Sequence, residues 1–153
     1  METIERVSVL HGTAAAVWAR VVTAEGINDE FAPWMRMTLP RSVRSIADVT
    51  PGVPFGRSWI LAFGVIPIDY DDLCIVELEP GHFLERSRLF SAPVWEHGRT
   101  VVDAPSGCEL HDRVSFEPRR IVQRIPGGVR LHRAVVGSIF THRHRRLCRH
   151  FNR

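Results

Sequence analysis

Four polar side chains in the second half of the sequence carry the chemistry needed for acid–base work. They are His97, Arg99, Asp112 and His144. An imidazole beside a carboxylate can act as a general base, and a guanidinium can stabilise negative charge that develops on a substrate. Whether they can act together depends on the elements that position them.

Asp112 lies in a segment whose side chains alternate between two faces of a predicted strand. One face carries Cys108, Leu110, Asp112, Val114 and Phe116. Because side chains point to opposite sides in turn, we expect this apolar face to be buried with Asp112 on it. A buried carboxylate without a partner is costly, so Asp112 needs one.

The preceding predicted strand offers such partners. Trp95, His97, Arg99 and Val101 share one of its faces. If residues 103–107 form the loop of a hairpin, His97 or Arg99 comes within reach of Asp112. His144 follows Phe140 by four residues and can share the apolar stripe of a helix.

Two interpretations of this cluster stay open. In one, the side chains serve ligand binding or catalysis at a cavity. In the other, Asp112 and Arg99 form a structural pair that fixes the hairpin, and His144 is hydrogen-bonded in the core. In both, we expect an ionised Asp112 that is held by Arg99 or His97.

The remaining sequence predicts the elements around this cluster. Residues 3–10 favour a strand, and Thr13 and Thr23 are placed to cap two short helices, the second ending before Pro33. Short apolar segments separated by Pro and Gly then predict strands over 36–39, 56–63, 71–79, 83–90, 95–102 and 108–116, with a long loop over 42–54. A helix is expected over 129–151. This order has no alternation of strand and helix, which excludes a doubly wound parallel sheet.

Composition limits the class of protein. With 153 residues, 44% of them hydrophobic, the chain suits one domain spanning residues 1–153. No run approaches the roughly 20 apolar residues of a membrane span, and the first residues do not have the pattern of a secretory signal, so we expect a cytoplasmic protein. Three cysteines without a CxxC pair, and histidines without HExxH spacing, predict no disulfide framework and no metal site, and we expect no cofactor.

Charge is concentrated in two places. The net charge is +3, and arginines and histidines crowd residues 142–153. We interpret this basic end as the solvated face of the last helix and do not expect nucleic-acid binding. The acidic segment from Asp69 to Asp72 could hold a cation or share a proton, but a solvated turn is the simpler interpretation.

Several longer segments resemble the SRPBCC superfamily, also called START-like or helix-grip proteins, and in particular its polyketide cyclase/dehydrase-like branch. They are VWARVVTAEGINDEFAPW, FGVIPIDYDDLCIVELEPG, WEHGRTV with LHDRVSFEP, and FTHRHRRLCRHF. The resemblance implies an α+β helix-grip fold, in which a curved antiparallel sheet of about six to seven strands, two short helices and a long carboxy-terminal helix enclose a cavity. It does not imply a reaction, because such folds host many functions.

The expected function is therefore binding of a small hydrophobic or amphipathic molecule. We expect the lining to include Trp59, Trp95, Val136 and Phe140 together with His97, Arg99, Asp112 and His144. One alternative is an enzyme of the polyketide cyclase or dehydratase type, with the same four polar residues as its candidates. A second alternative is interaction with nucleic acid or protein through the basic last helix.

Overall fold

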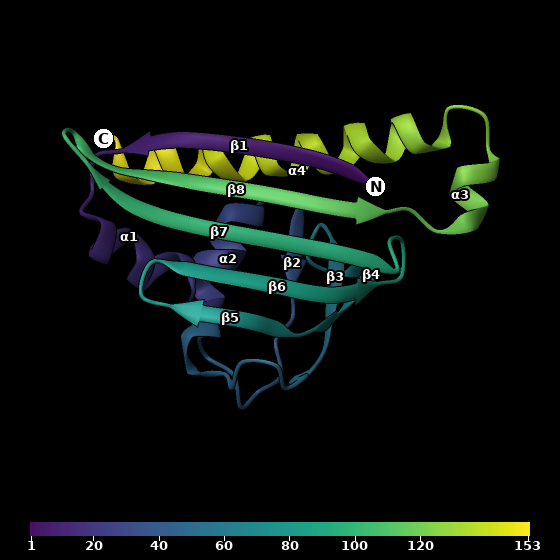
Figure 1. Ribbon diagram of the computed structural model, residues 1–153, viewed down its shortest axis with the longest axis horizontal. Coiled ribbons are helices and arrows are strands. Elements are labelled where there is room, and N and C mark those ends of the chain that lie inside the picture. Colours follow the sequence, from purple (N-terminus) through teal and green to yellow (C-terminus); the bar gives the residue numbers. More distant parts are fainter.

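A curved antiparallel sheet wraps around one long helix in the computed structural model, which describes all 153 residues (Figure 1). The strands are β1 (Glu2–Leu10), β2 (Met35–Met37), β3 (Gly56–Ala62), β4 (Ile66–Leu73), β5 (Ile75–Glu79), β6 (His82–Leu89), β7 (Val94–Ala104) and β8 (Gly107–Glu117). The helices are α1 (Ala14–Val21), α2 (Ala24–Phe31), α3 (Arg120–Arg124) and α4 (Gly128–Phe151), with a single 3₁₀ turn, η1, at Ile46–Asp48. The sheet order is β1-β8-β7-β6-β4-β3-β2, and β5 also pairs with β6. The predicted α+β helix-grip fold is confirmed, with eight strands in place of six to seven.

The two short helices begin where the sequence indicates. Thr13 Oγ1 accepts a hydrogen bond from the Ala16 amide at 3.1 Å, and Thr23 Oγ1 accepts one from the Gly26 amide at 3.0 Å. Each threonine thus satisfies an amide that the first turn of its helix leaves free. The helices follow β1 and bring α2 against α4.

One predicted strand was wrong. Residues 71–79 are not a single strand but the end of β4 and the whole of β5, which meet at Cys74. The acidic segment from Asp69 to Asp72 is not a solvated turn either, because it belongs to β4 and pairs with β3. Asp71 shares the inward face of β4 with Leu73 and is only 4% exposed. A carboxyl group is therefore buried where the sequence suggested a surface loop.

The β7–β8 hairpin is confirmed and is tighter than predicted. Ala104 pairs with Gly107, so the turn itself consists of Pro105 and Ser106. Gly107 has a φ of +139°, and a side chain there would collide with the Leu10 carbonyl, so only glycine fits. The register places Arg99 directly opposite Asp112. The face of β8 that was expected to be buried is buried.

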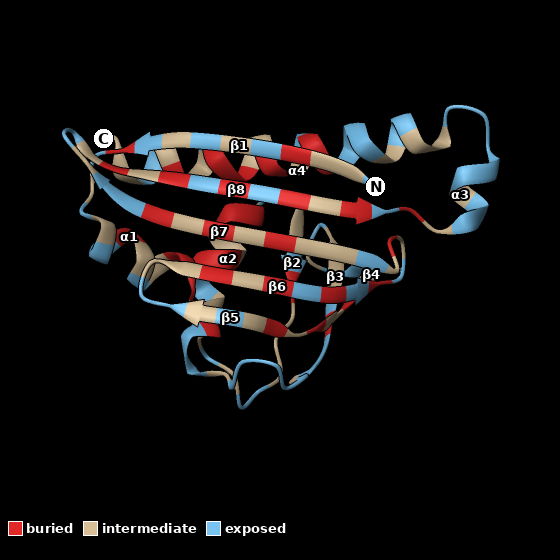
Figure 2. Cartoon of the chain, in the orientation of Figure 1, coloured by how far each residue is buried: buried red, intermediate tan, exposed pale blue.

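Helix α4 crosses the concave face of the sheet and packs against it from Val136 onward. Its buried apolar side chains are Val136, Phe140 and Leu147, as the predicted stripe requires. Figure 2 shows alternating buried residues along β7 and β8, and an exposed α3 and first part of α4 that extend beyond the sheet. No helix is both long and apolar enough to cross a bilayer, and the cytoplasmic location stays a prediction.

Candidate functional site

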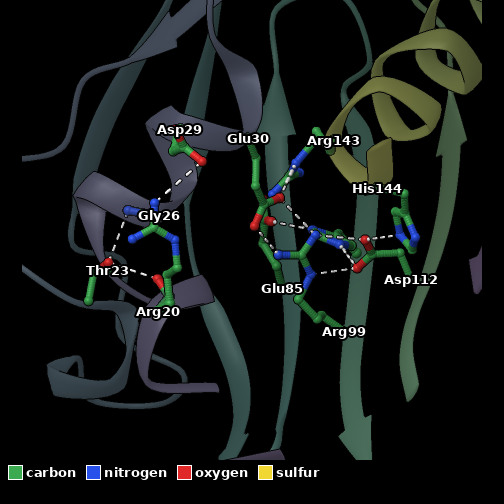
Figure 3. A network of polar contacts seen from close by, with 11 residues as sticks. Arg20, Thr23, Gly26, Asp29, Glu30, Glu85, Arg99, Asp112, Arg143 and His144 are labelled. Atoms are coloured by element: carbon green, nitrogen blue, oxygen red, sulfur yellow. Dashed lines mark hydrogen bonds and ion pairs between the residues drawn. The ribbon is translucent and has the colours of Figure 1, made fainter. Parts of the chain in front are cut away.

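Asp112 is the centre of a buried polar network formed by β7, β8 and α4 (Figure 3). Its Oδ1 accepts from Arg99 Nε at 2.8 Å and lies 2.8 Å from His97 Nε2. Its Oδ2 accepts from Arg99 Nη2 at 2.7 Å and lies 2.9 Å from His144 Nε2. All four predicted polar residues thus meet at one carboxylate, and the expectation that Arg99 or His97 holds Asp112 understated the number of its partners.

Glu30 extends this network to α2. It accepts two hydrogen bonds from Arg99, with Nη1 at 2.7 Å and Nη2 at 3.0 Å. It accepts a third from Arg143 Nε at 2.8 Å. The guanidinium of Arg143 also lies against the rings of Phe31 and Phe140, at 4.7 and 4.9 Å from their centroids. Four elements of the fold are therefore tied together at one buried point.

The positive charges keep both carboxylates ionised although they are buried. Burial opposes ionisation of Asp112, but the charge of Arg99 and hydrogen bonds from Arg99 and His144 outweigh it, so the pKa of this carboxyl lies well below its usual range. Burial likewise opposes ionisation of Glu30, yet the charges of Arg143 and Arg99 lower its pKa. Two carboxylates balance two guanidiniums, so the core holds no net charge from these four groups.

The two histidines occupy different environments. Nδ1 of His144 lies 2.7 Å from Ser8 Oγ, so a neutral ring can accept there while Nε2 donates to Asp112. Nδ1 of His97 instead lies 3.7 Å from Glu85 Oε2. His97 therefore joins the Asp112 network to a second group of carboxyls.

A cavity of about 230 Å³ lies between the sheet and α4, next to this network. Of its 24 lining residues 17 are hydrophobic, so most of the wall cannot hydrogen-bond. The aromatic wall is Phe31, Phe83, Trp95 and Phe140, and the polar lining is Asp69, Asp71, Glu85, Ser91, His97, His132 and Arg143. An apolar pocket with a few convergent polar groups is the usual form of a small-molecule site.

Asp71 and Glu85 form an interacting carboxyl pair in the wall of this cavity. Asp71 Oδ1 and Glu85 Oε1 are both buried without a hydrogen-bond partner. Burial and then the charge of Glu85 raise the pKa of Asp71 well above its usual range. Burial opposes ionisation of Glu85, but the neighbouring His97 lowers the pKa of Glu85. One proton between the two carboxyls, held mainly by Asp71, accounts for both directions.

Comparison with known proteins decides the family. Residues 8–151 match the family described as "Domain of unknown function (DUF8410)". The chain belongs to this family. Comparison with curated proteins finds no match for this DUF8410 chain.

Solved structures share the DUF8410 chain's fold at low sequence identity. Protein CV1439 from Chromobacterium violaceum is 16% identical, with a TM-score of 0.72 over 99% of this chain and 98% of that one. A START superfamily protein from Mycobacterium smegmatis is 9% identical, with a TM-score of 0.65 over 98% and 97%. DynU16, from the dynemicin biosynthetic locus, is 16% identical, with a TM-score of 0.65 over 98% of this chain and 47% of DynU16. These likenesses confirm the predicted SRPBCC, START-like fold.

The predicted ligand-binding residues of this DUF8410 chain separate into three groups. Trp95, His97, Val136 and Phe140 line the cavity. Arg99, Asp112 and His144 lie behind it and are occupied by one another, by Glu30 and by Ser8. The prediction that these three residues contact the cavity is therefore wrong, since only His97 of the four polar candidates lines it.

Trp59 forms the third group, and the prediction that it lines the cavity is wrong. It is 43% exposed and lies on the outer face of β3, where its ring meets Tyr70 at a centroid distance of 5.7 Å. Its neighbours Ser58 and Ile60 are the residues that turn inward, Ser58 being fully buried and Ile60 lining the cavity. Strand alternation therefore carries the Trp59 ring away from any enclosed ligand.

Sequence reasoning missed three charged residues of the site, Glu30, Glu85 and Arg143, and it assigned a fourth, Asp71, to a solvated turn. Arg143 follows Phe140 by three residues and precedes Leu147 by four, so helical spacing assigns it to the buried stripe and not to the solvated basic face. Glu85 lies two residues after Phe83 on β6, so strand alternation places both on the same buried face. The periodicity was sufficient to find both residues.

Proposed function

We propose that this chain binds a small apolar or amphipathic molecule in the cavity between the sheet and α4. The observation that carries the proposal is the cavity itself, which is enclosed by 17 hydrophobic residues and has its polar groups gathered from a few strands and α4. Filling it removes apolar surface from water, which favours binding. The START-like fold supports the same conclusion, and one structural relative comes from a biosynthetic locus.

The size of the cavity limits the ligand. An apolar cavity of about 150 Å³ accommodates benzene, with its six carbon atoms. By proportion, about 230 Å³ corresponds to roughly nine non-hydrogen atoms. A single substituted ring fits this volume, whereas a steroid or a phospholipid does not fit without expansion.

The two alternative functions stay predictions. A cyclase or dehydratase needs groups that can exchange protons with a bound substrate. The polar atoms of Arg99, Asp112 and His144 are instead hydrogen-bonded to other residues of the protein. That arrangement supports the structural interpretation of these three residues. The basic end offers fewer free arginines for interaction with other macromolecules than its sequence suggests, since Arg143 is buried against Glu30 and Arg146 donates to Asp29.

Two measurements test ligand binding. Native mass spectrometry of protein purified from its own host should show a co-purifying small molecule. Ethylbenzene, added to purified protein, should raise the melting temperature in a concentration-dependent way because it binds only the folded state.

A variant that fills the cavity supplies the control. Val136 lines the cavity, and Val136→Phe should abolish the ethylbenzene shift. Leu131→Phe adds an aromatic ring on the same helix at a residue that is 67% exposed, and it should leave the shift intact. An equal shift in both variants, each with a cooperative melting transition, contradicts binding in this cavity.

A further inference from the structure

The polar part of the cavity wall contains carboxyl oxygens that have no hydrogen-bond partner. Asp71 on β4 and Glu85 on β6 are 4% and 6% exposed, and each presents a buried oxygen without a hydrogen-bond partner. Both residues line the cavity. Buried polar groups are nearly always paired, so this exception indicates a role for the pair.

The surrounding charged groups leave this pair available to a ligand. Asp69, also on β4, is occupied by the amides of Tyr70 and Ser91 and by the Ser91 hydroxyl. Arg143 on α4 is bound to Glu30.

Two histidines complete these surroundings. His97 on β7 has Nε2 at Asp112 and Nδ1 at 3.7 Å from Glu85 Oε2. His132 on α4 lines the same cavity, and its Nδ1 is also buried without a hydrogen-bond partner. No arginine forms an ion pair with Asp71 or Glu85.

We propose that the ligand of this cavity carries a protonated amine on a small apolar body, and that the amine donates hydrogen bonds to the unpartnered oxygens of Asp71 and Glu85. The inference rests on the proposed function, because it assigns the polar end of the same ligand. An ammonium group has the donors that both unpartnered oxygens lack, and charge-assisted hydrogen bonds are stronger than neutral ones. An anionic ligand would instead meet an ionised carboxylate.

Charge conservation favours an amine over a neutral hydroxyl. When an ammonium enters and a proton leaves, the net charge of the buried site does not change, so binding buries no additional uncompensated charge. A hydroxyl would leave the shared proton in place and would gain only a weaker neutral hydrogen bond. The aromatic wall adds attraction, since Phe, Tyr and Trp faces attract cations.

Proton release makes the proposal testable by pH. While Asp71 is protonated in the free protein, binding of one ammonium releases one proton, and the association constant rises by up to about tenfold per pH unit. The ligand stays charged over this range because an alkylamine has a pKa near 10.

The experiment compares 2-phenylethylamine with 2-phenylethanol, which has the same number of non-hydrogen atoms and no charge. Isothermal titration calorimetry at pH 5.5, 6.5 and 7.5, in two buffers with different ionisation heats, measures affinity and protons released. We expect the amine to bind at least about tenfold more tightly than the alcohol at pH 7.5. It should release up to one proton, and its advantage should shrink as the pH falls. Equal affinities, or amine binding without proton release, would overturn the inference.

Two variants and one control assign the effect to the pair. Glu85→Gln and Asp71→Asn should each reduce the amine-to-alcohol affinity ratio to about one, and Asp71→Asn should fold normally because it replaces a protonated carboxyl with an amide of the same shape. Glu79→Gln, an exposed acid on β5, should keep the full ratio. A ratio that survives Asp71→Asn contradicts the proposal. Failure of the proposed function looks different, since then ethylbenzene, the alcohol and the amine all fail to bind the unchanged chain.

Discussion

Replacing Arg99 should destabilise the fold more than replacing Arg99 and Asp112 together. Arg99 is fully buried and donates two hydrogen bonds to Asp112 and two to Glu30. In an Arg99→Met variant, Asp112 loses its only guanidinium, whereas Glu30 keeps Arg143. The uncompensated charge of Asp112 therefore causes most of the loss.

The size of the effect follows from the cost of an unpaired buried charge. Removing one partner of a buried ion pair costs about 3–5 kcal/mol, while replacing both partners with neutral groups is often close to neutral. Small domains have about 5–15 kcal/mol of total stability, so the single variant should be severely destabilised. In the double variant Arg99→Met/Asp112→Asn, the amide can still meet His97 and His144, and we expect it to recover about 2 kcal/mol of the loss.

Urea unfolding at pH 7, followed by circular dichroism, measures all three proteins. A second readout is pH, because burial without Arg99 should raise the pKa of Asp112 and make the single variant more stable at pH 5 than at pH 7. The reasoning is refuted if the double variant is less stable than the single one, or if Arg99→Met loses under 1 kcal/mol.

Three further predictions concern the acid range, the core and the basic end. Asp112 and Glu30 have lowered pKa values in the folded state, so their ionised forms stabilise the fold fully above the unfolded pKa values near 4, and this stabilisation is lost as the pH falls through the lower folded values. The free energy of unfolding, measured as a function of pH in the acid range, should show this loss, and Asp112→Asn should make its pH dependence less steep. Phe140→Asp places a charge at a residue that is 2% exposed and should cost at least about 4 kcal/mol by thermal melting, whereas Leu131→Asp should change stability by under about 0.5 kcal/mol. Random RNA should give no mobility shift at physiological salt, because exposed arginines such as Arg145 lack an aromatic platform, and a persistent shift would contradict this.

Local periodicity accounts for what the sequence could predict. Alternation along β7 and β8 was enough to put His97, Arg99 and Asp112 on one buried face, because a strand has only two faces. The short turn then made their register predictable. The same rule failed at Trp59, since Trp59 and Leu61 share one face and Ser58 and Ile60 the other, and a register shift between Ile60 and Leu61 complicates the pattern.

The contacts that the sequence could not predict join segments far apart in the chain. Glu30 and Arg99 are separated by 69 residues, and nothing in either segment specifies the other. Asp71 and Glu85 meet across β4 and β6, which pair at only two positions, so no long ladder indicates their register. Such pairings depend on how the sheet curves and on where α2 and α4 are placed against it.

Helix α4 has an uneven distribution of packing along its length. No residue from Gly128 to Val135 is buried, whereas Val136 begins the buried stripe that continues to Leu147. Its first two turns should therefore open at a lower free energy than its second half, and their amide hydrogens should exchange with solvent sooner. Because His132 and Val135 in these turns line the cavity, such local opening would uncover the ligand without disturbing Asp112 and its partners. The lifetime of a bound molecule would then follow the fraying of one helix end, while the stability of the domain follows the buried ion pairs.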